Sequence, residues 1–238
     1  MAKSIKIKHP KHVQSFHDNL AEVDLLMDIH IKIAGPTRGR KANLETLNKS
    51  AIVLLTACWE SFIEDLLSAS FDYLMSKSTS YKTIPSNVLK NIANQLKNDK
   101  HELKIWELSD TGWKKILLEY KDQILFDKLD YFHVPRPDKI DDLFKQLLGL
   151  NNITSKLTWK KMSNNKVKLI LNNFIDIRGA IAHKVKTSKS IQKKDVLNYI
   201  MFLNRIGIIL HNEVNDHLSA LSDDISPWDY YVFNNPKT

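Results

Sequence analysis

The stretch Ile52-Val-Leu-Leu-Thr-Ala-Cys-Trp-Glu-Ser-Phe-Ile-Glu-Asp-Leu66 lies inside a long run of helical periodicity that extends over residues 44–75. Apolar side chains recur through this run at steps of three and four residues, as they do on one face of an α-helix. The apolar stripe is broad enough to contact several neighbouring elements, which is typical of the central helix of a bundle. The stretch therefore predicts an all-α protein built around this helix.

Three other segments, residues 13–34, 166–182 and 195–221, show the same periodicity. Together with residues 44–75 they predict a four-helix core. Residues 85–150 contain shorter helical segments, which we expect to form an elaboration inserted in the middle third of the chain. We interpret the whole chain as one domain that ends in an aromatic tail at residues 227–238.

Local signals set several helix boundaries. Gly35-Pro36 ends the first helix, and Asp195 is expected to cap the last one. Gly149 follows the apolar residues of 138–148 and is predicted to be a helix C-cap. The region 99–127 is predicted to hold one short and one longer helix, divided near residues 111–112.

Composition limits where the protein acts. The chain contains six Gly, seven Pro and one Cys in 238 residues, which favours long helices over many turns. The single cysteine, Cys58, lies in an apolar run, excludes an internal disulfide and fits a reducing cytoplasm. The N-terminus lacks the apolar region of a signal peptide, and no apolar run reaches the roughly 18 residues that span a bilayer. We expect a soluble, cytoplasmic protein with no membrane partner.

Positive charge is concentrated in one part of the sequence. Residues 152–194 contain eleven Lys or Arg and a single acid, Asp176, giving about +10, whereas the whole chain carries +8. Within this region lies Arg178-Gly-Ala-Ile-Ala-His183. A positive field beside a titratable imidazole is typical of chemistry on a polyanion. A solvated, Lys-rich surface is the alternative interpretation.

The spacing of Arg178 and His183 is weak evidence by itself, because Arg205 and His211 stand at a similar spacing in the last predicted helix. That second pair flanks an apolar stretch, so we expect it to border a packed face. Five positions along a helix correspond to about 140° of rotation, so Arg178 and His183 do not share one face. They converge on one substrate if the helix ends near His183, or if a second copy of the chain completes the site. The structural alternative is a helix-end Arg and a capping His.

Three segments, taken in order, resemble the HEPN superfamily, and most closely its RiboL-PSP-HEPN group. The first is the helix at 52–66, with its aromatic–Glu–x–aromatic–x–Glu–Asp pattern. The second is residues 135–150, followed by Trp159, and the third is residues 176–183, similar to the family's Arg-x(4–6)-His signature. The resemblance covers roughly residues 45–215. Many relatives carry a polar residue at the position of Gly179 and a Gly at that of Lys184.

The resemblance implies a metal-independent endoribonuclease that acts as a homodimer, with the Arg–His motifs of both subunits meeting at the interface. His183 would exchange a proton with the 2′-hydroxyl or the leaving oxygen, and Arg178 would stabilise the charge of the transition state. The products would be a 2′,3′-cyclic phosphate and a 5′-hydroxyl, so the substrate would be RNA. No cofactor and no metal are expected. Relatives of this kind imply a toxin–antitoxin or antiphage defence system, with an antitoxin or other regulatory protein as a possible partner.

Further residues are candidates for supporting roles. Glu60 and Glu64 share one helix face and are expected either to orient Arg178 or His183 or to be ordinary surface acids. The RNA-binding candidates are Lys156, Lys160, Lys161, Lys184 and Lys186.

Two other functions stay open at this stage. The first is a catalytically silent HEPN-like module that binds RNA or a protein partner, favoured by Gly179 and Lys184. The second is a helical scaffold that pairs with an acidic partner. Trp159 and Trp113 are candidates for base stacking, although a tryptophan in a bundle is more often part of the core.

Overall fold

The computed structural model describes residues 10–35, 44–184, 189–222 and 226–231. Within these ranges the chain forms seven α-helices and three short 3₁₀-helices, with no β-strand, so the predicted all-α class is confirmed. The described part contains one isolated β-bridge, between Trp159 and Met162. None of the helices in these ranges is long and apolar enough to cross a membrane.

Helix α2 (Glu45–Lys77) is the centre of the fold, and its buried side chains extend along its whole length. It contacts α1 (Lys11–Ala34), α4 (Gly112–Leu129), α5 (Pro137–Leu148), α6 (Asn164–Lys184) and α7 (Lys193–Leu221). Its Trp59 and Phe62 rings stack with centroids 5.7 Å apart. Cys58 is buried, and burial raises the pKa of its thiol to about 11, which is the behaviour of a small core side chain.

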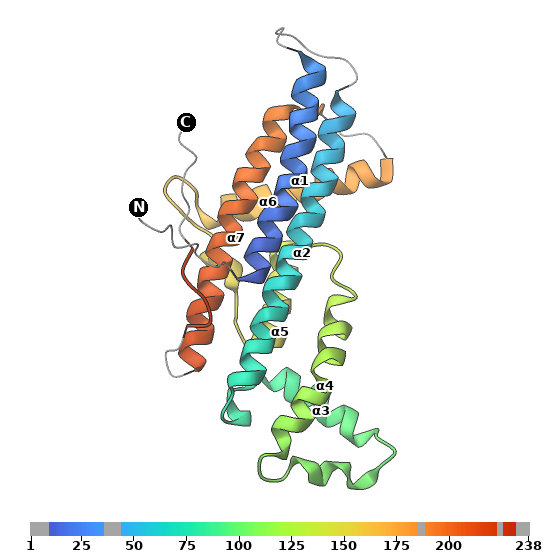
Figure 1. Cartoon of the computed structure of the whole chain (residues 1–238), viewed down its shortest axis with the longest axis vertical. Coiled ribbons are helices and arrows are strands. Elements are labelled where there is room, and N and C mark those ends of the chain that lie inside the picture. The colour runs from blue at the N-terminus through green and yellow to red at the C-terminus, as the bar shows by residue number, and fades with distance from the viewer. Residues whose placement is uncertain (1–9, 36–43, 185–188, 223–225, 232–238) are drawn as a thin grey trace, which may run out of the picture.

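Helices α1, α2 and α7 run alongside one another, whereas α6 crosses α1 and α2 (Figure 1). The approach of α7 depends on Gly207, since an added Cβ there would lie 3.2 Å from Phe16 and 3.3 Å from Phe62. Helix α6 contributes Leu171 and Phe174 to the core and packs on α2. All four helices expected to form the core therefore contribute to it, and the C-terminal end of α6 extends past α2 in Figure 1.

The middle third of the chain consists mainly of α3 (Ser86–Lys97), α4 and α5; α3 and α4 form the lower part of the molecule in Figure 1, and α5 packs on α2. The 3₁₀-helix η2 (Glu102–Leu108) precedes α4, in agreement with the predicted division near residues 111–112. Helix α5 ends at Gly149, whose φ of 71° and ψ of 8° are left-handed, as predicted for a C-cap.

One predicted boundary is wrong. Asp195 does not cap α7: the N-cap is Gln192, and Asp195 is the third residue of the helix. The Asp195 carboxylate accepts a hydrogen bond from the Gln192 backbone N–H at 2.9 Å, and the Gln192 side chain accepts in return from the backbone at position 195. The two residues form a capping box, so the acid reaches the helix start from within the first turn.

The aromatic tail docks on its own chain as far as Tyr231. Asn215 donates to the Trp228 carbonyl at 3.0 Å and accepts from the Trp228 N–H at 3.1 Å. Asn212 makes the same pair of bonds to Tyr231, both at 2.9 Å. These two asparagines of α7 hold the tail by its backbone, and residues 232–238 lie outside the described residues.

Candidate active site at the end of helix α6

Arg178 belongs to the face of α6 that packs toward α2. It follows the buried residues Leu171 and Phe174 at steps of three and four, and it is half-buried. One charged group on which Arg178 acts is Glu60 of α2. Burial raises the pKa of the Glu60 carboxyl, and the charges of Arg178 and then His133 act against that rise. Arg178 therefore lies within electrostatic reach of a half-buried acid on the central helix.

His183 lies on a different face of α6. It is exposed, and so are Asp176 and Leu169, which lie seven and fourteen positions earlier on the same face, whereas Gly179 and Ala180, one turn earlier, are half-buried. The helix continues to Lys184, so both members of the motif remain on regular helix. Because five positions turn a helix by about 140°, Arg178 and His183 of one chain point away from each other. The structure does not bring the two side chains together within one chain.

The surface of α6 at Gly179, between the two residues, is not covered by other described parts of the chain. An added Cβ at Gly179 would meet no heavy atom within 4 Å. Nothing in the packing of the described residues therefore requires glycine at that position. Ala182 is exposed beside it, so the final turns of α6 present backbone and small side chains to solvent.

A polar cluster lies on the His183 face of α6 and includes the extended segment before α5. The Arg136 guanidinium donates to Asn172 Oδ1 at 3.3 Å and pairs with the Asp176 carboxylate, both on α6. Trp59 Nε1 of α2 donates to the Pro135 carbonyl at 3.3 Å, which fixes the segment against the central helix. Asp176, the one acid of residues 152–194, is thus paired with an arginine outside that region.

Sequence reasoning assigned no role to Arg136 and His133. Their local signal is the run His133-Val-Pro-Arg-Pro137, because each proline pushes the residue before it out of the helical region and so holds the segment extended. That signal predicts an extended segment but not its position. Only the packing of α5 and α6 on α2 brings His133 of this segment within electrostatic reach of Glu60.

Glu64 is half-buried, one turn further along α2. Burial raises the pKa of its carboxyl, the charges of Glu60 and Asp65 raise it further, and His133 opposes them. The structure places Glu60 near Arg178 electrostatically, whereas Arg178 does not figure among the charges that act on Glu64. Of the two acids, Glu60 is the one on whose carboxyl the Arg178 charge acts.

The candidate RNA-binding lysines divide between the two ends of α6. Lys160 and Lys161 are exposed in the turn before the helix, and Lys184 is exposed at its last residue. With a rise of 1.5 Å per residue, a helix of 21 residues separates these ends by about 30 Å. Lys156 lies 3.7 Å from Glu213 in an ion pair, and Lys186 lies outside the described residues. Lys160 and Lys161 therefore lie at the opposite end of α6 from Lys184.

The second Arg–His pair is part of the packing of the fold. His211 is 1% exposed; its Nδ1 lies 2.9 Å from His12 Nε2, and its Nε2 lies 3.1 Å from the Asp229 carbonyl. The Arg205 guanidinium lies 4.8 Å from the centre of the Trp159 ring, which also packs near Phe202. These contacts agree with the expectation that this pair borders a packed face.

The two candidate base-stacking tryptophans are both half-buried. Trp159 is covered on one side by Arg205, and Trp113 packs against the hydrophobic core. Among the residues the structure describes, no group of three or more His, Cys, Asp or Glu side chains is arranged to hold a metal ion.

These features define an all-α protein with a half-buried arginine and an exposed histidine near the end of one helix. The sequence model of the RiboL-PSP-HEPN family matches residues 17–216, which is most of the chain. The chain therefore belongs to the RiboL-PSP-HEPN family, and this membership associates it with nuclease-like or RNA-related modules. Searches among curated proteins and among solved structures found no significant match.

Proposed function

We propose that the protein is a metal-independent endoribonuclease whose active site forms between two copies of the chain. The observation that carries this proposal is the placement of Arg178 and His183 on opposed faces of α6, beside the uncovered surface at Gly179. Two-fold symmetry gives each copy the same surface, so His183 of one subunit can face the partner's Arg178. RNA is the proposed substrate and a homodimer the proposed assembly.

The chemistry follows from the two side chains and from RNA itself. The 2′-oxygen attacks the adjacent phosphorus, the bond from phosphorus to the 5′-oxygen breaks, and a 2′,3′-cyclic phosphate and a 5′-hydroxyl remain. His183 takes the proton from the 2′-hydroxyl or gives one to the leaving oxygen, with water serving the other transfer. Its exposure leaves the imidazole open to substrate.

Arg178 supplies the charge that this reaction needs at the phosphorus. Its planar guanidinium can donate two parallel hydrogen bonds to the oxygens that gain negative charge in the transition state. Glu60 acts through Arg178: its half-buried carboxyl restrains the arginine from the α2 side. We assign Glu60 a positioning role and leave Glu64 without one.

A toxin–antitoxin or antiphage defence role is the biological setting we propose, because a small endoribonuclease without a cofactor needs external control. An antitoxin or other regulatory protein would then cover the exposed end of α6. The alternative function is a silent HEPN-like module that binds RNA or a protein partner. The observation that favours it is the basic residue Lys184 directly after His183, at a position where many relatives carry Gly.

The deciding experiment incubates the purified protein with RNA in EDTA and identifies the chemistry of the cut ends. We expect cyclic phosphate and 5′-hydroxyl ends, lost in His183→Ala and unchanged in His101→Ala, which alters another exposed histidine far along the chain. Intact RNA with the folded wild-type dimer would contradict the proposal. Binding without cleavage, insensitive to His183→Ala, would support the silent module instead.

A further inference from the structure

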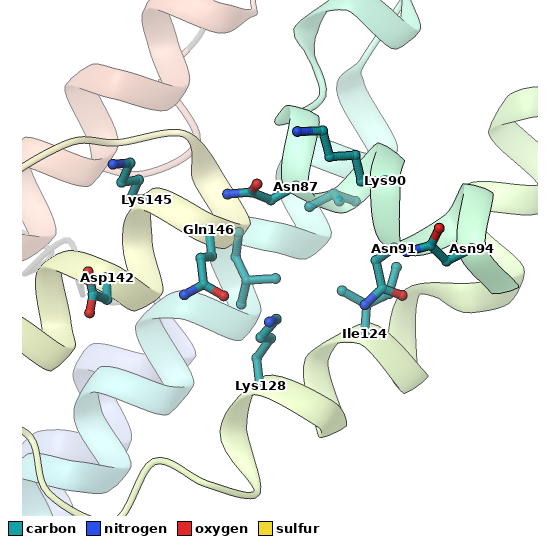
Figure 2. A pocket seen from close by; sticks show the side chains of 11 residues that line it. Asn87, Lys90, Asn91, Asn94, Ile124, Lys128, Asp142, Lys145 and Gln146 are labelled. Atoms are coloured by element: carbon teal, nitrogen blue, oxygen red, sulfur yellow. The ribbon is translucent and has the colours of Figure 1, made fainter.

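Helix α3 has two different faces, and each lines a cavity. Asn87, Asn91 and Asn94 belong to the polar face and line the cavity between α3, α4 and α5 that Figure 2 shows. Leu89 and Ala93 belong to the other face and line a second cavity, of about 520 Å³. Ligand pockets commonly have volumes of roughly 300–1,000 Å³, so the second cavity can hold a small organic molecule.

Three separate segments of the sequence form the walls of this second cavity. Residues 79–81 form one wall, at the start of the 3₁₀-helix η1 (Tyr81–Thr83). Leu89 and Ala93 of α3 belong to the second wall, and Leu108 and Trp113 belong to the third, at the corner between η2 and α4. Helix α3 contacts both η2 and α4, which brings the walls together.

The corner between η2 and α4 is a tight turn with an unusual backbone. Asp110 has a φ of 53°, in the left-handed region that Asp and Asn tolerate better than most other residues. At Gly112, the first residue of α4, an added Cβ would lie 1.8 Å from the Glu107 carbonyl oxygen. The Gly112 N–H donates to the Ser109 carbonyl at 2.9 Å. These features hold residues 108–113, which include the third wall, in one compact turn.

The apolar walls of the cavity are accessible to a ligand. Tyr81 is 51% exposed, Ala93 is exposed, and Leu89, Leu108 and Trp113 are half-buried. An apolar ligand that covers these side chains removes them from water, which is the main source of affinity in small-molecule sites. The cavity is therefore suited to an aromatic or branched aliphatic group.

A single charge accompanies the apolar walls. Asp110 is the only charged side chain among the described residues that line the cavity, in a chain whose net charge is +8. Within the described part of the chain, its carboxylate forms neither an ion pair nor a hydrogen bond. An unneutralised carboxylate attracts a cation, and the faces of Tyr and Trp rings, such as those of Tyr81 and Trp113, do so as well.

We propose that this second cavity binds a hydrophobic amine, which is an aromatic or branched aliphatic group that carries an ammonium. The apolar group lies against the walls from α3 and η1, and the ammonium pairs with Asp110 beside the Trp113 ring. Helices α3 and α4 form the lower part of the molecule in Figure 1, away from α6. The cavity is therefore separate from the candidate active site, and the proposal does not depend on nuclease activity.

The first test compares three probes of similar shape and different charge, whose affinities for the full-length protein are measured by ligand-observed NMR. The probes are 2-(1-naphthyl)ethylamine, a cation at neutral pH, the neutral 2-(1-naphthyl)ethanol and the anionic 3-(1-naphthyl)propionate. We expect the amine to bind at least tenfold more tightly than the alcohol, and the carboxylate to bind most weakly. Equal affinities for the three probes, or no binding of the amine, would overturn the proposal.

Two variants test the two parts of the site. Asp110→Asn removes the charge but keeps a residue that tolerates the left-handed backbone, so the affinity for the amine should fall to that for the alcohol. Ala93→Phe fills the cavity from an exposed position of α3 and should weaken all three probes at least tenfold. Asp216→Asn is the matched control, because Asp216 is an exposed acid of α7 that does not line the cavity.

A preference for the amine that survives in Asp110→Asn, or that Asp216→Asn abolishes as well, would contradict the assigned charge. Binding that Ala93→Phe leaves unchanged would contradict the assigned cavity. His183→Ala should bind the amine as the wild-type protein does, which separates this result from the fate of the proposed active site.

Discussion

Two Arg–His pairs of similar spacing lie in two helices of this protein, and their surroundings give them opposite properties. Arg178 is half-buried and His183 is exposed. Among the described residues, neither side chain has a hydrogen-bonded side-chain partner. Arg205 lies over Trp159, and His211 is buried and joined to His12 and to the tail. The first pair leaves its hydrogen-bonding groups available to a substrate, whereas the second uses them inside the fold.

The comparison teaches that spacing alone does not identify a catalytic pair. A histidine that exchanges protons with a substrate must be reachable, and an arginine that binds phosphate must have unused donors. Only the pair at the end of α6 meets both conditions.

The largest effect should come from the first pair. His183→Ala and Arg178→Ala should each lower the RNA cleavage rate by about 100-fold or more, the loss usual for a general acid–base or a transition-state charge. His183→Ala should alter stability by no more than about 0.5 kcal/mol, because His183 is exposed. Gel-based cleavage rates and thermal melting of the same samples measure the two properties. A large loss of stability in His183→Ala would show that His183 serves the fold, as His211 does.

The second pair should behave in the reverse way. His211→Ala leaves His12 and the Asp229 carbonyl without their partner in a buried site, which should lower the free energy of unfolding by about 2–3 kcal/mol. The tail should loosen as well, because Trp228 packs against both imidazoles. Urea unfolding followed by tryptophan fluorescence measures both effects. A variant that melts like wild type but no longer cleaves RNA would reverse the assignment of the pairs.

Stability should depend on pH through the buried histidines. Burial, together with the neighbouring His211, lowers the pKa of His12 to about 3, and burial also lowers that of His211. The unfolded chain then binds more protons than the folded one below a pH of about 6.5, so stability is full above that pH and falls as the pH drops toward 3. The slope should approach about 1.4 kcal/mol per pH unit for each proton. Unfolding curves at several pH values should show a weaker slope in His12→Gln and the wild-type slope in His183→Ala.

The smallest effect concerns the lysines before α6. If Lys160 and Lys161 contact RNA phosphates, each Gln substitution should lower the slope of log affinity against log salt by about 0.7, with little change in the cleavage rate at low salt. To keep the RNA intact, each lysine substitution is combined with His183→Ala. The affinity of each protein for RNA is then measured at several salt concentrations, which gives the slope. Lys139→Gln should leave the slope unchanged. Equal slopes in all three variants would show that these lysines form an ordinary solvated surface.

Much of the fold could be predicted from the sequence because the signals are local. The helix predicted at 13–34 is observed as Lys11–Ala34, and Gly149 ends α5 as expected, since periodicity and cap chemistry involve residues a few positions apart. The cap of α7 was misplaced by three residues because Asp195 and Gln192 share that role.

The arrangement of the site could not be predicted in the same way. The contact of Arg136 with Asp176 joins residues 40 positions apart and exists only once α5 and α6 pack on α2. Residues that form one basic region in the sequence lie at both ends of a long helix. The direction in which α6 crosses the bundle depends on ridges and grooves of several helices, which no local pattern encodes.

Subunit complementation tests the central claim most directly. Arg178→Ala and His183→Ala proteins, each inactive alone, are mixed in equal amounts under conditions that exchange subunits. If His183 of one subunit acts with the partner's Arg178, half of the dimers are mixed and each holds one intact site, so about a quarter of wild-type activity should return. A mixture that contains the mixed dimer but stays as inactive as its parents would contradict the shared site.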